Sequence, residues 1–220
     1  MKDDREEYEE LMKMIRGLDP KKTLTALKNY SDRGNINATF NLWASRRFNI
    51  TDEEKQAYWE RLVRQYDEEP LEFDGDLMIG IGTEFQDRYC DDNKRLDNLA
   101  EALKWFTRAY DLDDPDAARW ILFTYEYSRL EGLDDEYCEW CIRVLKDADF
   151  YIENDTMDFA GMKDSRETVG DAINAIIKMA NRGNSRAQHT IGTMFLNGGF
   201  LGKDEDVGRK WIERSQSGNV

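Results

Sequence analysis

The sequence predicts an all-α protein, more specifically a right-handed α–α superhelix (a solenoid) of about six helical hairpins. First, 220 residues include only three prolines and are 40% hydrophobic, so helix breakers are few and a core can be buried. Second, apolar residues recur at helical spacing along most of the chain. Third, Cys138 follows Ala102 by 36 residues, and Cys141 follows Trp105 by 36. A constant period of this length is typical of stacked helical hairpins.

The first 73 residues are expected to form four helices. Residues 3–16 have the pattern of an acidic amphipathic helix. Pro20 fits the first turn of a second helix, which is expected to stop near Gly34, and a third helix follows. Thr51 and Glu54 have the spacing of a capping box, which predicts the start of the fourth helix.

The next units repeat the same features more clearly. Residues 81–85 match residues 191–195, with an Ile-Gly-Thr start and a closing Phe in both. Residues 87–95 are predicted to be an enlarged acidic loop. Residues 117–125 align with residues 187–195, and the second helix of that unit is expected from about Asp134 to Ala148.

The stretch 150–168 fits the pattern poorly, and a divergent helix is expected at about residues 154–162. The regular pattern resumes at Val169. The chain is therefore predicted to be one repeat domain over residues 1–220. Its clear repeats are 74–149 and 169–219, and its divergent parts are 1–73 and 150–168.

The last forty residues contain every feature of a helical hairpin. Gly183 stands where a helix should stop, because glycine accepts the left-handed conformation without a Cβ penalty. Gly192 indicates a close helix–helix contact without room for a side chain, and Trp211 is expected to fill the space between the two helices. One helical face is shared by Ala187, Ile191 and Phe195.

These residues resemble the Sel1-like repeat, a relative of the tetratricopeptide repeat. Its pattern is A-x-x-G-N-x-x-A-Q-x-x-L-G-x-x-Y-x-x-G, followed by a helix with A-x-x-W. The resemblance covers most of residues 22–219 and implies a protein-binding module whose first helices line a concave surface. The residues implied on that surface are Phe40, Asn41, Thr83, Asp87, Arg119, Trp120, Phe123, Tyr127, His189 and Thr193. For Trp120 and Phe123, packing against a neighbouring helix is an equally open alternative.

Catalysis, a cofactor and a bound metal are not expected. Cys138 and Cys141 form a C-x-x-C, but no strand precedes them, as a redox site would need, and core packing explains them. A zinc site with His189 is disfavoured because that residue lies about three helices further on. The resemblance also includes a disulfide-rich branch associated with penicillin binding, whose cysteine framework is missing here. A penicillin-binding hydrolase and a C-x-x-C redox enzyme are therefore the less favoured alternatives.

Charge and cysteine content point to a cytoplasmic protein with a protein partner. The net charge is −15, with −17 over residues 1–160 and +2 over residues 161–220, which disfavours nucleic acid and anionic membrane. A basic partner is the sharper expectation, and an immunity protein or antitoxin that neutralises a basic toxin is the alternative function. Three cysteines cannot all pair within one chain, which favours a reducing compartment. No apolar run is long enough for a membrane span, and the start does not have the pattern of a secretory signal.

Overall fold

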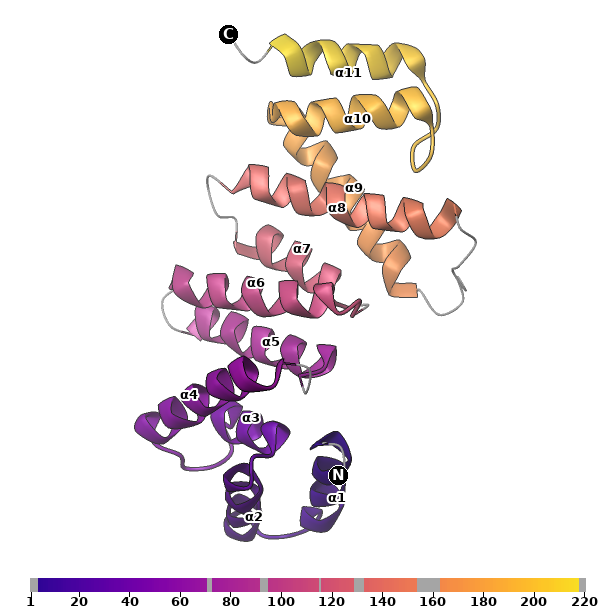
Figure 1. Cartoon of the computed structure of the whole chain (residues 1–220). Helices are drawn as coiled ribbons and strands as arrows, with labels where there is room; N and C mark the ends of the chain where they lie inside the picture. The colour runs from indigo at the N-terminus through magenta and orange to yellow at the C-terminus, as the bar shows by residue number, and fades with distance from the viewer. Residues whose placement is uncertain are drawn as a thin grey trace. The chain divides into compact units, whose positions relative to one another are not determined.

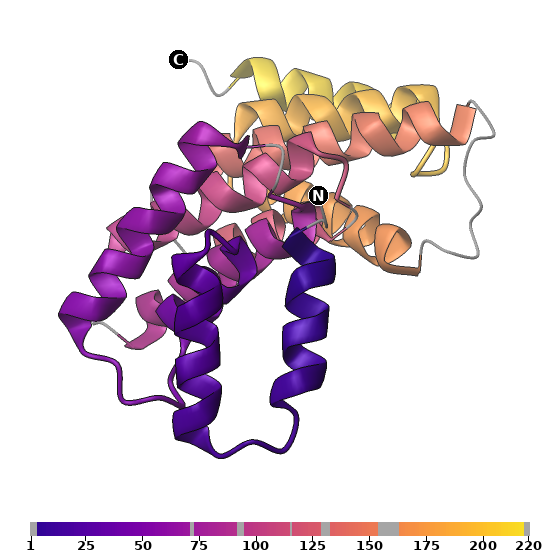
Figure 2. The same cartoon turned by 60° about the horizontal axis from the view of Figure 1, so that its bottom comes forward.

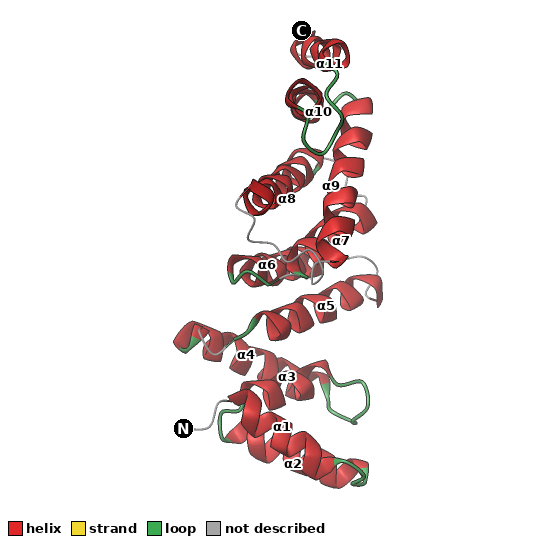
Figure 3. Ribbon diagram, turned by 90° about the vertical axis from the view of Figure 1, so that its right-hand side faces the viewer, coloured by secondary structure: helices red, strands yellow, loops and turns green. Residues whose placement is uncertain are grey.

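The structure is a computed structural model, and it describes residues 4–70, 73–91, 95–114, 116–128, 133–153 and 163–217. These residues form eleven α-helices and contain no strand, so the all-α prediction is confirmed for them (Figures 1 and 3). The chain divides into two compact units, residues 1–114 and 115–220, called unit 1 and unit 2 below. The superhelix with about six hairpins and the single domain over residues 1–220 stay predictions.

Unit 1 contains six helices. They are α1 (Asp4–Ile15), α2 (Pro20–Asp32), α3 (Ile36–Ala44), α4 (Asp52–Glu68), α5 (Gly75–Asp91) and α6 (Leu96–Asp111). Sequence neighbours pack on each other from α1 to α4, α5 packs on α6, and α3 also touches α5. Figure 2 shows α1 and α2 as a pair of helices running in opposite directions. The apolar core of this part includes Leu11, Leu27 and Leu42, all fully or almost fully buried.

The capping box at the start of α4 is confirmed. The Glu54 backbone N–H donates to Thr51 Oγ1 at 3.2 Å, and the Thr51 backbone N–H donates to Glu54 Oε2 at 3.0 Å. Pro20 is in the first turn of α2, also as expected. Both signals could be read from the sequence because they concern the backbone N–H groups that the start of a helix leaves without partners. The capping box satisfies such groups, and proline has no N–H of its own.

The predicted acidic loop over residues 87–95 is wrong for its first half, because α5 continues to Asp91. The apolar face of the helix runs on from Phe85 to Tyr89, which is 4% exposed, so burial holds that turn helical. An ion pair between Arg88 and Glu84, one turn apart, supports the same segment.

Unit 2 contains five helices in its described residues. They are α7 (Ala117–Ser128), α8 (Asp134–Glu153), α9 (Lys163–Asn181), α10 (Ser185–Asn197) and α11 (Glu205–Ser217). Helix α8 extends five residues past its predicted end. The long α9 packs on α7, α8 and α10, and α10 pairs closely with α11 (Figure 1). The divergent helix expected at residues 154–162 lies outside the described residues.

Three helix ends share one hydrogen-bond pattern. At the ends of α2, α6 and α9, a backbone N–H donates to the carbonyl oxygen of the residue five positions earlier, at 3.1 Å in each case. The pairs of donor and acceptor residues are Asn35–Tyr30, Asp114–Ala109 and Asn184–Met179. The residue before each donor has a positive φ: 99° at Gly34, 58° at Asp113 and 98° at Gly183. This is the Schellman motif. Gly34 and Gly183 both stand at the helix ends expected of them, and they end their helices in the same way.

The helices that follow α2 and α9, namely α3 and α10, also start in the same way. The Asn35 side chain accepts from the Ala38 backbone N–H at 2.8 Å, and Asn184 accepts from Ala187 at 2.8 Å. The N-cap backbone angles are nearly the same, with ψ of 115° and 112°. A Gly-Asn pair thus ends one helix and starts the next.

Glycines stand at close helix contacts, as predicted for Gly192. A Cβ built on Gly192 would lie 2.8 Å from Ile212 Cδ1 and 3.0 Å from the carbonyl oxygen of Gly208. In the α5/α6 pair, a Cβ on Gly82 would overlap the ring of Phe106. Ile212 thus lies between α10 and α11. The neighbouring Trp211, expected there from the sequence, is half-buried like Ile212, and its place in this contact stays a prediction.

Candidate functional site

Helix α7 presents three of the predicted binding residues as one aromatic row, Trp120, Phe123 and Tyr127. Their spacing of three and four residues puts them on one face of the helix. The Trp120 and Phe123 rings meet edge to face at 6.1 Å, and the Phe123 and Tyr127 rings stack at 5.6 Å with 17° between their planes. Phe123 is 49% exposed and Tyr127 is 54% exposed, while Trp120 is half-buried.

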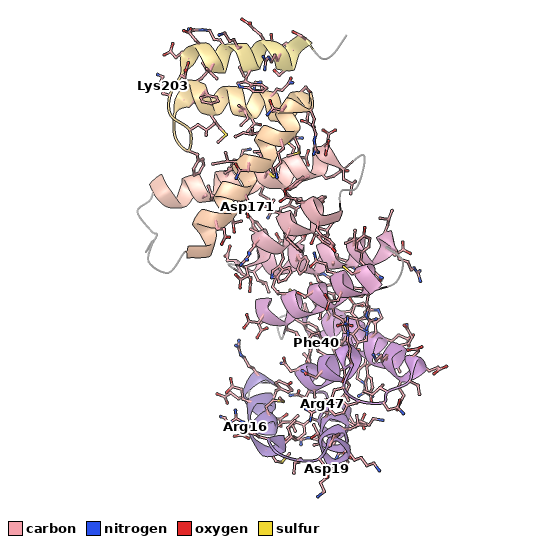
Figure 4. All side chains as sticks on the ribbon, turned by 180° about the vertical axis from the view of Figure 1, so that it is seen from behind. Arg16, Asp19, Phe40, Arg47, Asp171 and Lys203 are labelled. Carbon is pink, nitrogen blue, oxygen red and sulfur yellow. The ribbon has the colours of Figure 1, made fainter. Side chains whose placement is uncertain are left out.

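Charged side chains of α7 and α9 border this aromatic row. Glu126 of α7 pairs with Lys178 of α9 at 2.6 Å. The pKa of Asp171, labelled in Figure 4, is raised above its usual value, mainly by burial and then by Glu167 and Glu126, while Arg119 and Lys178 act in the opposite direction. Burial is thus the main cause of this shift, and the border of the row carries both carboxylates and cations.

The predicted residues of α10 lie on a different helix from the aromatic row. His189 is exposed, and the Thr193 hydroxyl donates to the His189 carbonyl within the same helix at 3.0 Å. Helix α10 packs on α8, α9 and α11. A binding surface that His189 and Thr193 share with the row of α7 stays a prediction.

The four predicted residues of unit 1 divide into packing and groove residues. Phe40, half-buried on α3, lies against α5, since a Cβ on Gly80 would be 3.1 Å from Phe40 Cζ. The Thr83 hydroxyl donates to the Ile79 carbonyl of its own helix at 2.8 Å. Asn41 and Asp87, in contrast, both line one groove of about 1120 Å³.

This groove lies among α1, the start of α2, the turn after α3 and part of α5. Its apolar lining includes Met12, Leu18 and Phe48. Four cations also line it: Lys13, Arg16, Arg46 and Arg47, of which Figure 4 labels Arg16 just after the end of α1 and Arg47 after the end of α3. Sequence reasoning did not select these cations. The available signal was a second row over residues 9–16, Glu9, Lys13 and Arg16, beside the apolar row of Tyr8, Met12 and Ile15.

The two cysteines of α8 have the properties of core residues. Cys138 and Cys141 are both fully buried, and neither forms a disulfide. Burial raises the pKa of the Cys138 thiol to about 11 and raises that of Cys141 further. Such thiols stay protonated at neutral pH and are poor nucleophiles. Within the described ranges, no group of three or more His, Cys, Asp or Glu side chains could hold a metal ion.

None of the helices in the described part of the chain is both long enough and apolar enough to cross a membrane.

Comparison with known proteins gives a match among solved structures. No family model matches the chain, and no curated protein matches it. The chain is similar to a solved Sel1 repeat protein from Oxalobacter formigenes, at 18% sequence identity and a TM-score of 0.34. The match covers 92% of this chain and 57% of the other, so this chain spans little more than half the length of that protein. Because the TM-score is so low, the assignment of repeats rests on the helix pairs and shared helix ends described above.

Proposed function

We propose that the chain is a non-catalytic protein-binding module, and that the aromatic row of α7 is its anchor. The observation that carries this proposal is the exposure of Phe123 and Tyr127, at 49% and 54%, on a regular helix. Aromatic side chains have few rotatable bonds, so they bury a large area at low entropic cost, and they are enriched where binding energy concentrates. The helix holds the two rings in a stacked pair before any partner arrives.

The partner that fits this surface has an apolar contact region with basic side chains around it. The net charge of −17 over residues 1–160, which include the aromatic row, supports a basic rather than an acidic border on the partner. Opposite potentials of this kind raise the association rate more than the final affinity. The role is that of a scaffold or adaptor in the cytoplasm, and a toxin recovered as the partner would make it an inhibitor instead.

The test begins with capture of partners on the full chain from a lysate of the native host, followed by mass spectrometry. Association and dissociation rates of the purified partner are then measured for the wild type and for Phe123→Ala and Tyr127→Ala. Loss of a central anchor often costs about 2 kcal/mol, so we expect dissociation to become roughly 30-fold faster. Leu96→Ala is the matched control, because Leu96 is 57% exposed and belongs to α6, not to the helix that carries the row.

Two results would contradict this proposal in separate parts. If the association rate does not change between about 50 and 300 mM salt, the proposal that the partner is basic is refuted. If the dissociation rate is unchanged in both aromatic variants, the proposal that the row is the anchor is refuted. Trp120→Ala adds a further distinction, since unchanged dissociation in that folded variant would make Trp120 a packing residue only.

A further inference from the structure

The groove of unit 1 carries positive charge in an otherwise acidic chain. The chain has a net charge of −15, yet Lys13, Arg16 and Arg47 line the groove with no ion-pair partner among the described residues. Of the three carboxylates that line it, Asp87 pairs with Arg46 at 3.6 Å and Glu84 pairs with Arg88 at 3.1 Å. Only Glu9 remains to offset the three unpaired cations, so the groove attracts a negatively charged occupant.

The floor between these cations is apolar and partly open. Met12 is 44% exposed and Leu18 is 36% exposed, while Ile15 and Leu27 below them are almost fully buried. Tyr8 closes the side toward the start of α1, and burial raises its pKa to about 12. Methionine adapts its shape to different apolar surfaces, which suits a site that accepts side chains from another molecule.

The size and the lining elements favour a helix as the occupant. The volume of about 1120 Å³ exceeds the range of ~300–1,000 Å³ typical of small-molecule pockets. Every lining residue belongs to a helix or to a connection between helices, so the groove offers no strand edge to which an extended peptide could bind. A helix satisfies its own backbone groups and needs only to bury an apolar row.

We infer that this groove binds an amphipathic helix of a partner protein, whose apolar row lies on Met12, Leu18 and Phe48 and whose flanking Glu or Asp side chains meet Lys13, Arg16 and Arg47. This site lies in unit 1 and differs in charge preference from the aromatic row of α7. This inference does not depend on the function proposed above, and an experiment can refute either proposal without refuting the other.

The test uses calorimetric titration of the full chain with two synthetic helical peptides of about 15 residues, the shortest length at which isolated helices form appreciably. Both carry leucine at positions i, i+3, i+4 and i+7. One has glutamate beside that row and the other has lysine. We expect the glutamate peptide to bind and the lysine peptide not to bind, and we expect added salt to weaken the binding.

Three variants locate the binding. Arg16→Glu combined with Arg47→Glu should raise the dissociation constant of the glutamate peptide about tenfold, since two ion pairs become two like-charge contacts. Arg64→Glu is the matched control, because Arg64 is exposed on α4 outside the groove and should leave binding unchanged. Met12→Asp should abolish binding, and its partly exposed position lets the variant fold, which circular dichroism verifies.

Several outcomes would overturn the inference. These are equal binding of the two peptides, no binding of the glutamate peptide, or an unchanged affinity in the double variant. Binding of dodecanoate without binding of the peptide would assign the groove to a small anionic amphiphile instead. A dimer in sedimentation that Met12→Asp dissociates would assign it to a second copy of this chain.

Discussion

The contact glycine Gly192 allows a stability prediction whose size follows from the structure. In Gly192→Ala the new Cβ would lie 2.8 Å from two atoms of Ile212 and 3.0 Å from the Gly208 carbonyl oxygen. Carbon atoms in good contact are ~3.5–4.0 Å apart, so α10 and α11 have to separate. Ile212 can rotate, but the backbone of Gly208 cannot yield without moving its helix. Overpacking of this kind costs ~1–3 kcal/mol, against a gain of at most ~1 kcal/mol in helix propensity.

Gly170 supplies the matched control for the same substitution. It lies inside α9, and a Cβ built on it would meet no atom within 4 Å. Gly170→Ala should therefore stabilise the protein by ~0.5–1 kcal/mol. We expect the two variants to differ by about 2 kcal/mol in urea unfolding followed by circular dichroism at 222 nm, and Gly192→Leu to be less stable than Gly192→Ala. If Gly192→Ala proved as stable as Gly170→Ala, the close approach of α10 and α11 would be disproved.

Three further predictions concern a strained residue, the thiols and a cap. Asp113→Gly should stabilise the protein by about 0.5–1 kcal/mol in the same urea assay, because Asp113 has a φ of 58° that glycine adopts more easily; a loss would refute the strain. In native protein at pH 8, a thiol reagent should modify Cys90 quickly and Cys138 and Cys141 slowly, and denaturant should make all three react. Since burial raises the pKa of Cys138 to about 11, its contribution to stability is complete below the unfolded pKa of ~8.5 and is lost as pH rises toward 11; the urea midpoint should fall over this window, less so in a Cys138→Ala variant. Thr51→Ala should cost about 1 kcal/mol, measured by the same unfolding, and an unchanged midpoint would mean that the capping box contributes nothing.

The features that sequence predicted well are those determined within a few residues. The capping box of Thr51, the glycine ends at Gly34 and Gly183, and the contact role of Gly192 each depend on one helix end or one helix pair. The loop predicted over residues 87–95 was wrong in its first half because residues in excess of the last hairpin were assigned to the loop, whereas residues 87–91 belong to α5. The buried side chain of Tyr89 decides that segment, and a sequence does not show which face of a charged stretch is covered.

The two candidate sites differ in the same way, because one depends on a single helix and the other on several. Phe123 and Tyr127 could be selected because the repeat register assigns α7 an outward face, and the structure leaves both half exposed. The groove of unit 1 could not be selected in this way. The groove brings together α1, the turn after α3 and α5, which are far apart in the sequence. The excess of positive charge on Lys13, Arg16 and Arg47 is evident only when the ion pairs of Asp87 and Glu84 are known.

The hydrogen-bond pattern at the ends of α2, α6 and α9 has a consequence for how such chains diverge. What recurs there is the geometry of donors and acceptors, while the residue in the left-handed position is glycine at 34 and 183 and aspartate at 113. An alignment scores glycine against aspartate as a mismatch, although both occupy one backbone conformation here. Residue identity can therefore drift while the turn is inherited intact. A search for relatives of this chain should thus use the positive φ and the five-residue hydrogen bond as its query, in addition to the letters of the sequence.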